Sequence, residues 1–129
     1  MNARPKVYIA GPMTGIPEFN FPAFHAAAKA WREVGWDAIN PADAFDGDTT
    51  RQYRDYVAAD MAVLRQCDAI ALLPGWDGPN ARGSVWEREI ARSLLHIPVF
   101  DAADPVWPEY VKLNPRTPLS VLPQDSKEK

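Results

Sequence analysis

The stretch DAIALL, residues 68–73, is apolar at every position after its aspartate. A strand that is exposed on one face alternates polar and apolar side chains, because successive residues point to opposite faces. A continuous apolar run is typical of a strand that is buried on both faces, as in a parallel sheet covered by helices on each side. This stretch therefore predicts an α/β protein with a central parallel strand.

The segments around this stretch alternate as such a sheet requires. Strands are expected at residues 6–10, 36–40 and 97–100; helices are expected at 22–34, from near Thr49 or Thr50 up to the central strand, and at 84–95. Parallel strands joined by helices form right-handed crossovers that cover both faces of the sheet. We expect a small doubly wound parallel sheet of four to five strands, flavodoxin-like or Rossmann-like.

The length and composition set limits on the protein class. We expect one α/β domain at residues 1–104, followed by a proline-rich extension and tail at 105–129 with a short helix near 108–112. The tail is expected to be loose or to pack on a partner. The net charge is −3 and no basic stripe is present, which argues against a nucleic-acid polymer as partner.

The cysteine count and the apolar runs bear on the compartment. Cys67 is the single cysteine, so it cannot form an internal disulfide, and no zinc-ligand spacing accompanies it. No run resembles a signal peptide or a membrane span. We expect a cytoplasmic protein that needs no cofactor, no metal and no membrane.

Two acids fall on the apolar faces of the expected helices. At 100° per residue, Asp60 shares a face with Tyr53, Tyr56, Val57, Leu64 and Cys67, and Glu87 shares one with Trp86, Ile90, Ala91 and Leu94. A carboxylate that points inward is costly unless it is hydrogen-bonded, paired or placed in a cavity. Both acids therefore need an explanation.

Glu87 has two explanations at this point. Ser84 and Glu87 match the S-x-x-E pattern of a capping box, in which the two residues satisfy free N–H groups at a helix start. Alternatively, Glu87 does chemistry. Asp60 lies in the middle of its helix, where capping offers no explanation.

The expected topology places Glu87 at the mouth of a cleft. In an open parallel sheet, ligands bind beyond the carboxyl ends of the strands. The segments that leave those ends are Gly11–Gly15, Asn40 and Pro74–Gly83, and Glu87 follows the third in the first helical turn. Gly83 and Ser84 at a helix N-terminus also favour an anion such as phosphate.

Three stretches together resemble the nucleoside 2-deoxyribosyltransferase superfamily, which includes the 2′-deoxynucleoside 5′-phosphate N-hydrolases. They are YIAGPMTG at residues 8–15, DMAVLRQCDAIALL at 60–73 and GSVWEREIA at 83–91. The resemblance spans roughly residues 6–100 and is strongest to a branch often carried by phages and prophages. It implies a flavodoxin-like or Rossmann-like fold and assembly as a homodimer or a higher homo-oligomer.

The resemblance also implies roles for individual residues. Glu87 takes the position of the nucleophile, Asp60 that of the helix-borne aspartate, and Tyr8 that of the tyrosine on the first strand. The expected substrate-binding residues are Gly11, Pro12, Met13, Thr14, Asn40, Trp76, Asp77, Gly83 and Ser84, with Trp76 stacking on the base. One position departs from the family: Ala81 stands where the transferases have a second aspartate, and the nearest candidates are Asp77 and Asn80.

The implied reaction is cleavage of the N-glycosidic bond of a nucleoside or its 5′-monophosphate, with water or a second base as acceptor. Glu87 would attack C1′, and Asp60 or Asp77 would assist. The main alternative is a binding module that senses a nucleotide. A phosphoribohydrolase is disfavoured because PGWDGPNARGS (residues 74–84) lacks the P-G-G-x-G-T pattern, and a redox flavodoxin because GPMTG has few hydroxyls. A purely structural protein is the last alternative.

Overall fold

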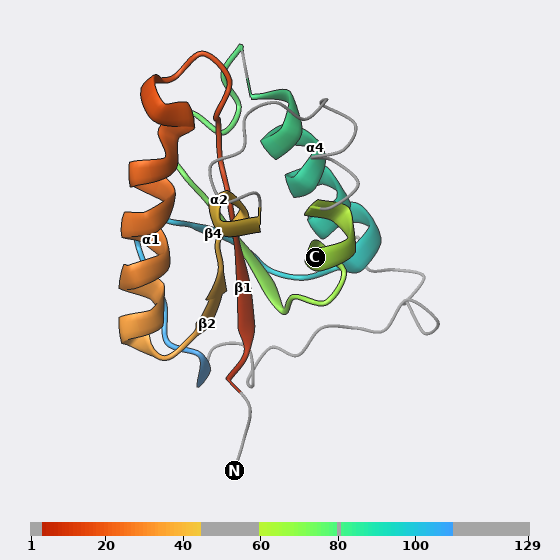
Figure 1. The fold of residues 1–129 in the computed structure, drawn as a ribbon. Coiled ribbons are helices and arrows are strands. Elements are labelled where there is room, and N and C mark those ends of the chain that lie inside the picture. Colours follow the sequence, from red (N-terminus) through yellow and green to blue (C-terminus); the bar gives the residue numbers. More distant parts are fainter. Residues whose placement is uncertain (1–3, 45–59, 80, 110–129) are drawn as a thin grey trace.

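The protein contains one sheet of four parallel strands (Figure 1). The structure is a computed structural model that describes residues 4–44, 60–79 and 81–109. The strands are β1 (Lys6–Ala10), β2 (Asp37–Ile39), β3 (Ala69–Leu72) and β4 (Val99–Asp101), in the order β2-β1-β3-β4. The predicted small doubly wound parallel sheet is confirmed.

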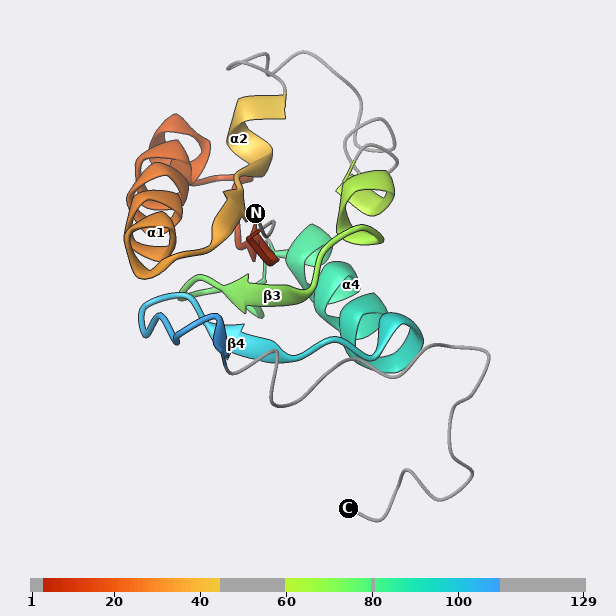
Figure 2. The same ribbon diagram turned by 90° about the horizontal axis from the view of Figure 1, so that it is seen from below.

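Helices cover both faces of this sheet. They are α1 (Phe21–Val34), α2 (Pro41–Ala44), a helical segment at residues 60–64, and α4 (Arg82–Ile90), which continues as a π-helical turn at Ala91–Leu95. A 3-10 turn, Pro17–Asn20, precedes α1. Figures 1 and 2 show α1 on one side of the strands and α4 on the other. The predicted helix start near Thr49 or Thr50 lies outside the described residues.

Strand β1 divides its side chains between two buried clusters. Val7 and Ile9 pack with the aromatic residues of α1 and with Trp36, whereas Tyr8 and Ala10 face the cluster that contains Leu64, Cys67 and Ala91. The division follows from the two-residue period of a strand. The central stretch of DAIALL is buried throughout, as the sequence predicts for a strand covered on both faces.

Helix α4 begins two residues earlier than predicted. The N–H of Val85 donates to the carbonyl of Ala81 at 3.1 Å, so the first helical turn already closes around Arg82 and Gly83. At the other end, His96 adopts the left-handed region with φ of 56°, and the chain turns into β4. Glu87 therefore lies in the second turn of α4 rather than in the first.

The first residues of the proline-rich extension pack on the domain. The indole N–H of Trp36 donates to the carbonyl of Val106 at 2.7 Å, and Pro108 is buried close to Gly35. Most of the predicted helix near residues 108–112, and the tail after it, lie outside the described residues. Within the described part of the chain, no helix has the length and the apolar character that crossing a bilayer requires.

Candidate active site

Tyr8 and Glu87 meet in the interior of the protein. Tyr8 points from β1 toward α4, and its hydroxyl donates a hydrogen bond of 2.8 Å to Oε2 of Glu87. The two side chains are 1% and 6% exposed. Asp60, from the helical segment on the same face, lines a pocket together with Glu87 and lies close enough to raise the pKa of both Tyr8 and Glu87. The structure thus brings the three predicted catalytic residues together, although they are far apart in the sequence.

The environment of these three groups favours their protonated forms. Burial, the charge of Asp60 and a hydrogen bond with Asp60 raise the pKa of Glu87 well above 4.5, against a smaller lowering by Tyr8. Burial also raises the pKa of Asp60, opposed by its hydrogen bonds with Glu87 and Tyr8. Two carboxyls in such contact titrate as a pair, because ionising one opposes ionising the other. The pair consequently keeps a proton to a higher pH than an isolated carboxyl.

A pocket of about 90 Å³ opens beside the two carboxyls. It lies at the carboxyl end of β1, where the strand order reverses between β1 and β3, which is the usual ligand position in a doubly wound sheet. Its lining residues are Gly11, Pro12, Met13, Thr14, Phe24, Pro41, Asp60, Met61, Ala81, Gly83, Ser84, Trp86 and Glu87. The pocket therefore combines an acidic end with largely apolar walls.

The capping box, one of the two explanations for Glu87, is not formed. The Ser84 hydroxyl lies 2.6 Å from the carbonyl oxygen of Trp76 and 3.1 Å from that of Ala81, and the carboxyl of Glu87 bonds Tyr8 instead of a backbone N–H. The cap position is Ala81, which has no side-chain hydrogen bond to the helix. Because the helix begins at Arg82, both residues of the S-x-x-E pattern already lie inside it.

The buried face of α4 is also narrower than predicted. Ser84, Glu87 and Ala91 are buried at spacings of three and four residues, which confirms that Glu87 points inward. Trp86 and Leu94 were predicted on the same face, but they are 56% and 55% exposed. Trp86 precedes Glu87 by 100° of helical rotation, and the π-helical turn moves Leu94 away from the α-helical projection.

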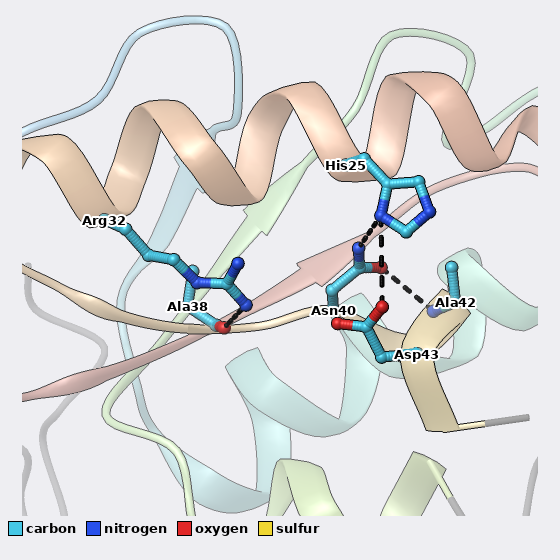
Figure 3. A network of polar contacts seen from close by, with 6 residues as sticks. All are labelled: His25, Arg32, Ala38, Asn40, Ala42 and Asp43. Atoms are coloured by element: carbon cyan, nitrogen blue, oxygen red, sulfur yellow. Dashed lines mark hydrogen bonds and ion pairs between the residues drawn. The ribbon is translucent and has the colours of Figure 1, made fainter. Parts of the chain in front are cut away.

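Asn40 was predicted to bind substrate, but it does not line this pocket. Its Oδ1 accepts a hydrogen bond from the N–H of Ala42, and its Nδ2 lies 2.9 Å from Nδ1 of His25 (Figure 3). Since Oδ1 is occupied by an N–H donor, Nδ2 faces the histidine and donates to it. Asp43 lies 3.9 Å from the same ring nitrogen. Asn40 thus fastens the start of α2 to α1.

Trp76 and Asp77 lie at a different pocket from the carboxyl pair. That pocket, at the carboxyl ends of β3 and β4, is also lined by Asp101. Trp76 is partly buried against the cluster around Tyr8, and the guanidinium of Arg88 lies 5.5 Å from the centre of its ring. The predictions that these two residues stack on a base and supply a proton beside Glu87 do not agree with these positions.

Five pocket residues were missed by the sequence reasoning: Phe24, Pro41, Met61, Ala81 and Trp86. Phe24 is part of the apolar repeat of its helix, so its sequence pattern resembles that of an ordinary core residue. Trp86 carried a usable signal, because a residue next to an inward acid at a helix start lies close to whatever that acid binds. The apolar periodicity assigned it to the interior instead.

The fold and the site define a doubly wound parallel α/β protein with a tyrosine and two carboxyls at its switch point. The chain belongs to the family described as Domain of unknown function (DUF4406), which matches residues 5–100. The matched range contains Tyr8, Asp60 and Glu87. A comparison with curated proteins found no match.

Proposed function

We propose that this protein cleaves the N-glycosidic bond of a nucleoside or its 5′-monophosphate, with Glu87 as nucleophile. The observation that carries the proposal is the buried Tyr8–Glu87 hydrogen bond at a pocket that Asp60 also lines. The sequence resemblance to nucleoside 2-deoxyribosyltransferases supports the same roles for these residues. Enzymes that form glycosyl intermediates use one carboxylate to attack and a second carboxyl to move a proton.

The two carboxyls suit different steps of this reaction. The ionised Glu87 attacks C1′, and its oxygen forms a bond to that carbon while the bond from C1′ to the base breaks. The electron pair leaves with the base, which takes the proton held by Asp60. Water then attacks C1′, Asp60 takes a proton from it, and Glu87 is released. The products are the free base and the sugar, which keeps its 5′-phosphate when the substrate is a 5′-monophosphate.

The contacts of the carboxyls bear on this division of roles. Tyr8 holds Oε2 of Glu87 and so orients the nucleophile. Burial and the nearby Asp60 raise the pKa of Glu87 well above 4.5, and the Tyr8 hydrogen bond opposes this rise in part, so Glu87 attacks from the fraction of molecules in which it has lost its proton. Burial raises the pKa of Asp60, which suits a group that must carry a proton near neutral pH. Asp77 lines another pocket, so Asp60 is the better candidate for the acid.

The backbone around the pocket suits the sugar or its phosphate. Gly83 and Ser84 lie in the first turn of α4, where N–H groups are not used by the helix, and both line the pocket opposite the loop at residues 11–14. A Cβ built on Gly83 meets no atom within 4 Å, so this side of the pocket is open to a ligand. Hydroxyl or phosphate oxygens accept hydrogen bonds from such groups.

A second candidate function is a binding module for the same ligand class. Ala81 stands where the transferases have an aspartate, and in this structure it is a buried residue of the pocket wall without a polar group. A protein that lacks this acid retains a shape for the ligand but has one proton-transfer group fewer. Catalysis by Asp60 and binding without catalysis are therefore the two outcomes to separate.

The deciding experiment is incubation with ribo- and deoxyribonucleosides and their 5′-monophosphates, with free base measured by chromatography. We expect release of base from at least one substrate. Glu87→Ala should lower the rate by at least about 10³-fold, on the scale seen when a nucleophile is removed. Glu89→Ala, two residues further along the exposed side of α4, is the matched control and should retain the rate.

The alternative outcomes are distinct. If no substrate releases base while a nucleotide raises the melting temperature, the protein is a binding module. If base is released and Glu87→Ala retains most of the rate, Glu87 is not the nucleophile. Folding of the variant is checked by circular dichroism, so that a loss of rate is not a loss of structure.

A further inference from the structure

Trp86 occupies an unusual position for a large aromatic residue. It directly precedes Glu87 on α4 and lines the same pocket, yet more than half of its surface is exposed. Leu94, in the π-helical turn that follows α4, is exposed to the same extent but does not line the pocket. Exposure of an indole at the rim of a pocket leaves a large flat surface available to a ligand.

The two tryptophans near the site differ in how their rings are used. The ring of Trp76 is partly buried and has the Arg88 guanidinium 5.5 Å from its centre. The carbonyl of Trp76 also accepts the Ser84 hydroxyl, which fixes this residue as an anchor for the start of α4. Trp86 has a largely exposed ring beside the carboxyls, and so it is the better placed of the two for stacking.

The geometry of a nucleoside leads to the same residue. The base is joined directly to C1′, the carbon that Glu87 would attack, so the base lies next to the carboxyl group. Consecutive helical residues are 1.5 Å apart along the axis and rotated by 100°, which places Trp86 at the edge of the space that Glu87 faces. The apolar side chains of Met13, Met61 and Phe24 line the same pocket.

We infer that Trp86 is the specificity residue that stacks on the base of the substrate, and that purine bases are preferred to pyrimidines. The inference rests on the proposed function in taking the ligand to be a nucleoside or nucleotide. Purines have the larger flat surface, and stacking of a base on an aromatic side chain is favourable for every base. The preference therefore follows from contact area rather than from hydrogen bonds to base edges.

The test compares Trp86→Phe, Trp86→Leu and the control Leu94→Ala. For base release, Trp86→Leu should raise KM for a purine nucleoside by about tenfold or more, the usual range for loss of base–aromatic stacking. Trp86→Phe should retain most of the affinity, because it keeps an aromatic face. Leu94→Ala should leave KM unchanged. An equal KM in all three variants and the wild type overturns the inference.

A binding measurement makes the test independent of catalysis. In a Trp107→Phe background, which removes the other strongly exposed indole, adenosine should quench the remaining tryptophan fluorescence through Trp86. Trp86→Leu should abolish the quenching. If adenosine quenches Trp86 but no base is released, the inference holds and the proposed catalysis fails. If base is released while Trp86→Leu alters neither KM nor quenching, catalysis holds and the inference fails.

Self-association is the competing role for an exposed tryptophan. Sedimentation of the wild type and Trp86→Leu measures it directly. A change in oligomeric mass with an unchanged KM overturns the inference, because Trp86 would then contact a second chain rather than the base. An unchanged mass with a raised KM supports it.

Discussion

The two faces of the sheet are packed for different purposes, although both use strand β1. Toward α1, Val7 and Ile9 pack against Phe24, Trp31 and Trp36 in a fully apolar cluster. Toward α4, Tyr8 meets two carboxyls whose pKa values are raised. Consecutive residues of one strand thus contribute to stability on one face and to a candidate reaction site on the other.

The two faces of the sheet also differ in how their buried polar groups are hydrogen-bonded. On the α1 face, the indole N–H of Trp31 donates to the carbonyl of Ala102 at 2.8 Å, and that of Trp36 donates to Val106. The rings of both tryptophans also contact Phe100. On the α4 face, the Glu87 carboxyl accepts a hydrogen bond from Tyr8, and both carboxyls border an open pocket. The indole N–H groups of the apolar layer are thus satisfied within the protein, whereas the other layer retains groups that can react.

The largest effect is expected for Trp31→Ala in the apolar layer. Removing a fully buried tryptophan should lower the free energy of unfolding by about 3–5 kcal/mol, measured by urea denaturation, because the lost contacts leave a cavity. The rate of base release per folded molecule should stay close to that of the wild type. A strong loss of rate in the folded fraction would contradict the assignment of stability to one face of the sheet and of the reaction site to the other.

A smaller effect, with a defined pH dependence, is expected for Glu87→Gln in the polar layer. Glutamine has the shape of the protonated acid and keeps an acceptor for Tyr8. Because the folded pKa of Glu87 is raised, the stability that its protonated form contributes is present below about pH 4.5 and is lost as the pH rises through the folded pKa. The melting temperature of Glu87→Gln relative to wild type should therefore increase from pH 4.5 toward pH 8.

Glu89→Gln on the same helix is the matched control for the direction of this pH dependence. A hydrogen bond from Ser93 lowers the pKa of this exposed acid, so its contribution to stability is present above about pH 4.5 and is lost as the pH falls. Its melting temperature relative to wild type should change in the opposite direction with pH, and only slightly. The same trend in both variants would contradict the assignment of a raised pKa to Glu87.

The smallest expected shifts are opposite displacements of the acid limb of the pH–rate profile in Tyr8→Phe and Asp60→Asn. The Tyr8 hydrogen bond lowers the pKa of Glu87, so removing it should raise that pKa and move the acid limb of the profile to higher pH. The charge of Asp60 raises the pKa of Glu87, so Asp60→Asn should move the acid limb to lower pH, with a reduced maximal rate. Shifts in the same direction would exclude the proposed coupling.

Much of the fold could be predicted from local patterns. The apolar run at residues 68–73 indicated the parallel sheet, and the helical spacing placed Asp60 and Glu87 among inward-facing residues. Both kinds of signal come from the periods of regular structure, which are independent of tertiary contacts. The inward position of Glu87 is confirmed, and Asp60 lies beside it at the pocket.

Other features could not be predicted because they depend on contacts between distant segments. The S-x-x-E pattern is the same whether Ser84 caps a helix or lies inside one. The Ser84 hydroxyl bonds to the carbonyl of Trp76, eight residues away, and the helix begins at Arg82. In the same way, both Trp76 and Trp86 are suitable for stacking by residue type, and only the folded arrangement separates an anchored ring from an exposed one.

The sequence by itself determined the alternation of strands and helices, the parallel sheet and the inward direction of the two acids, because these follow from local periodicity. The cost of burying a charge then marked the two acids as candidates for a functional role. The tertiary structure decided what those acids contact. Only the pairing of β1 with β3 and the packing of α4 on that face bring Tyr8 within 2.8 Å of Glu87, since residues so distant in the chain meet only after folding.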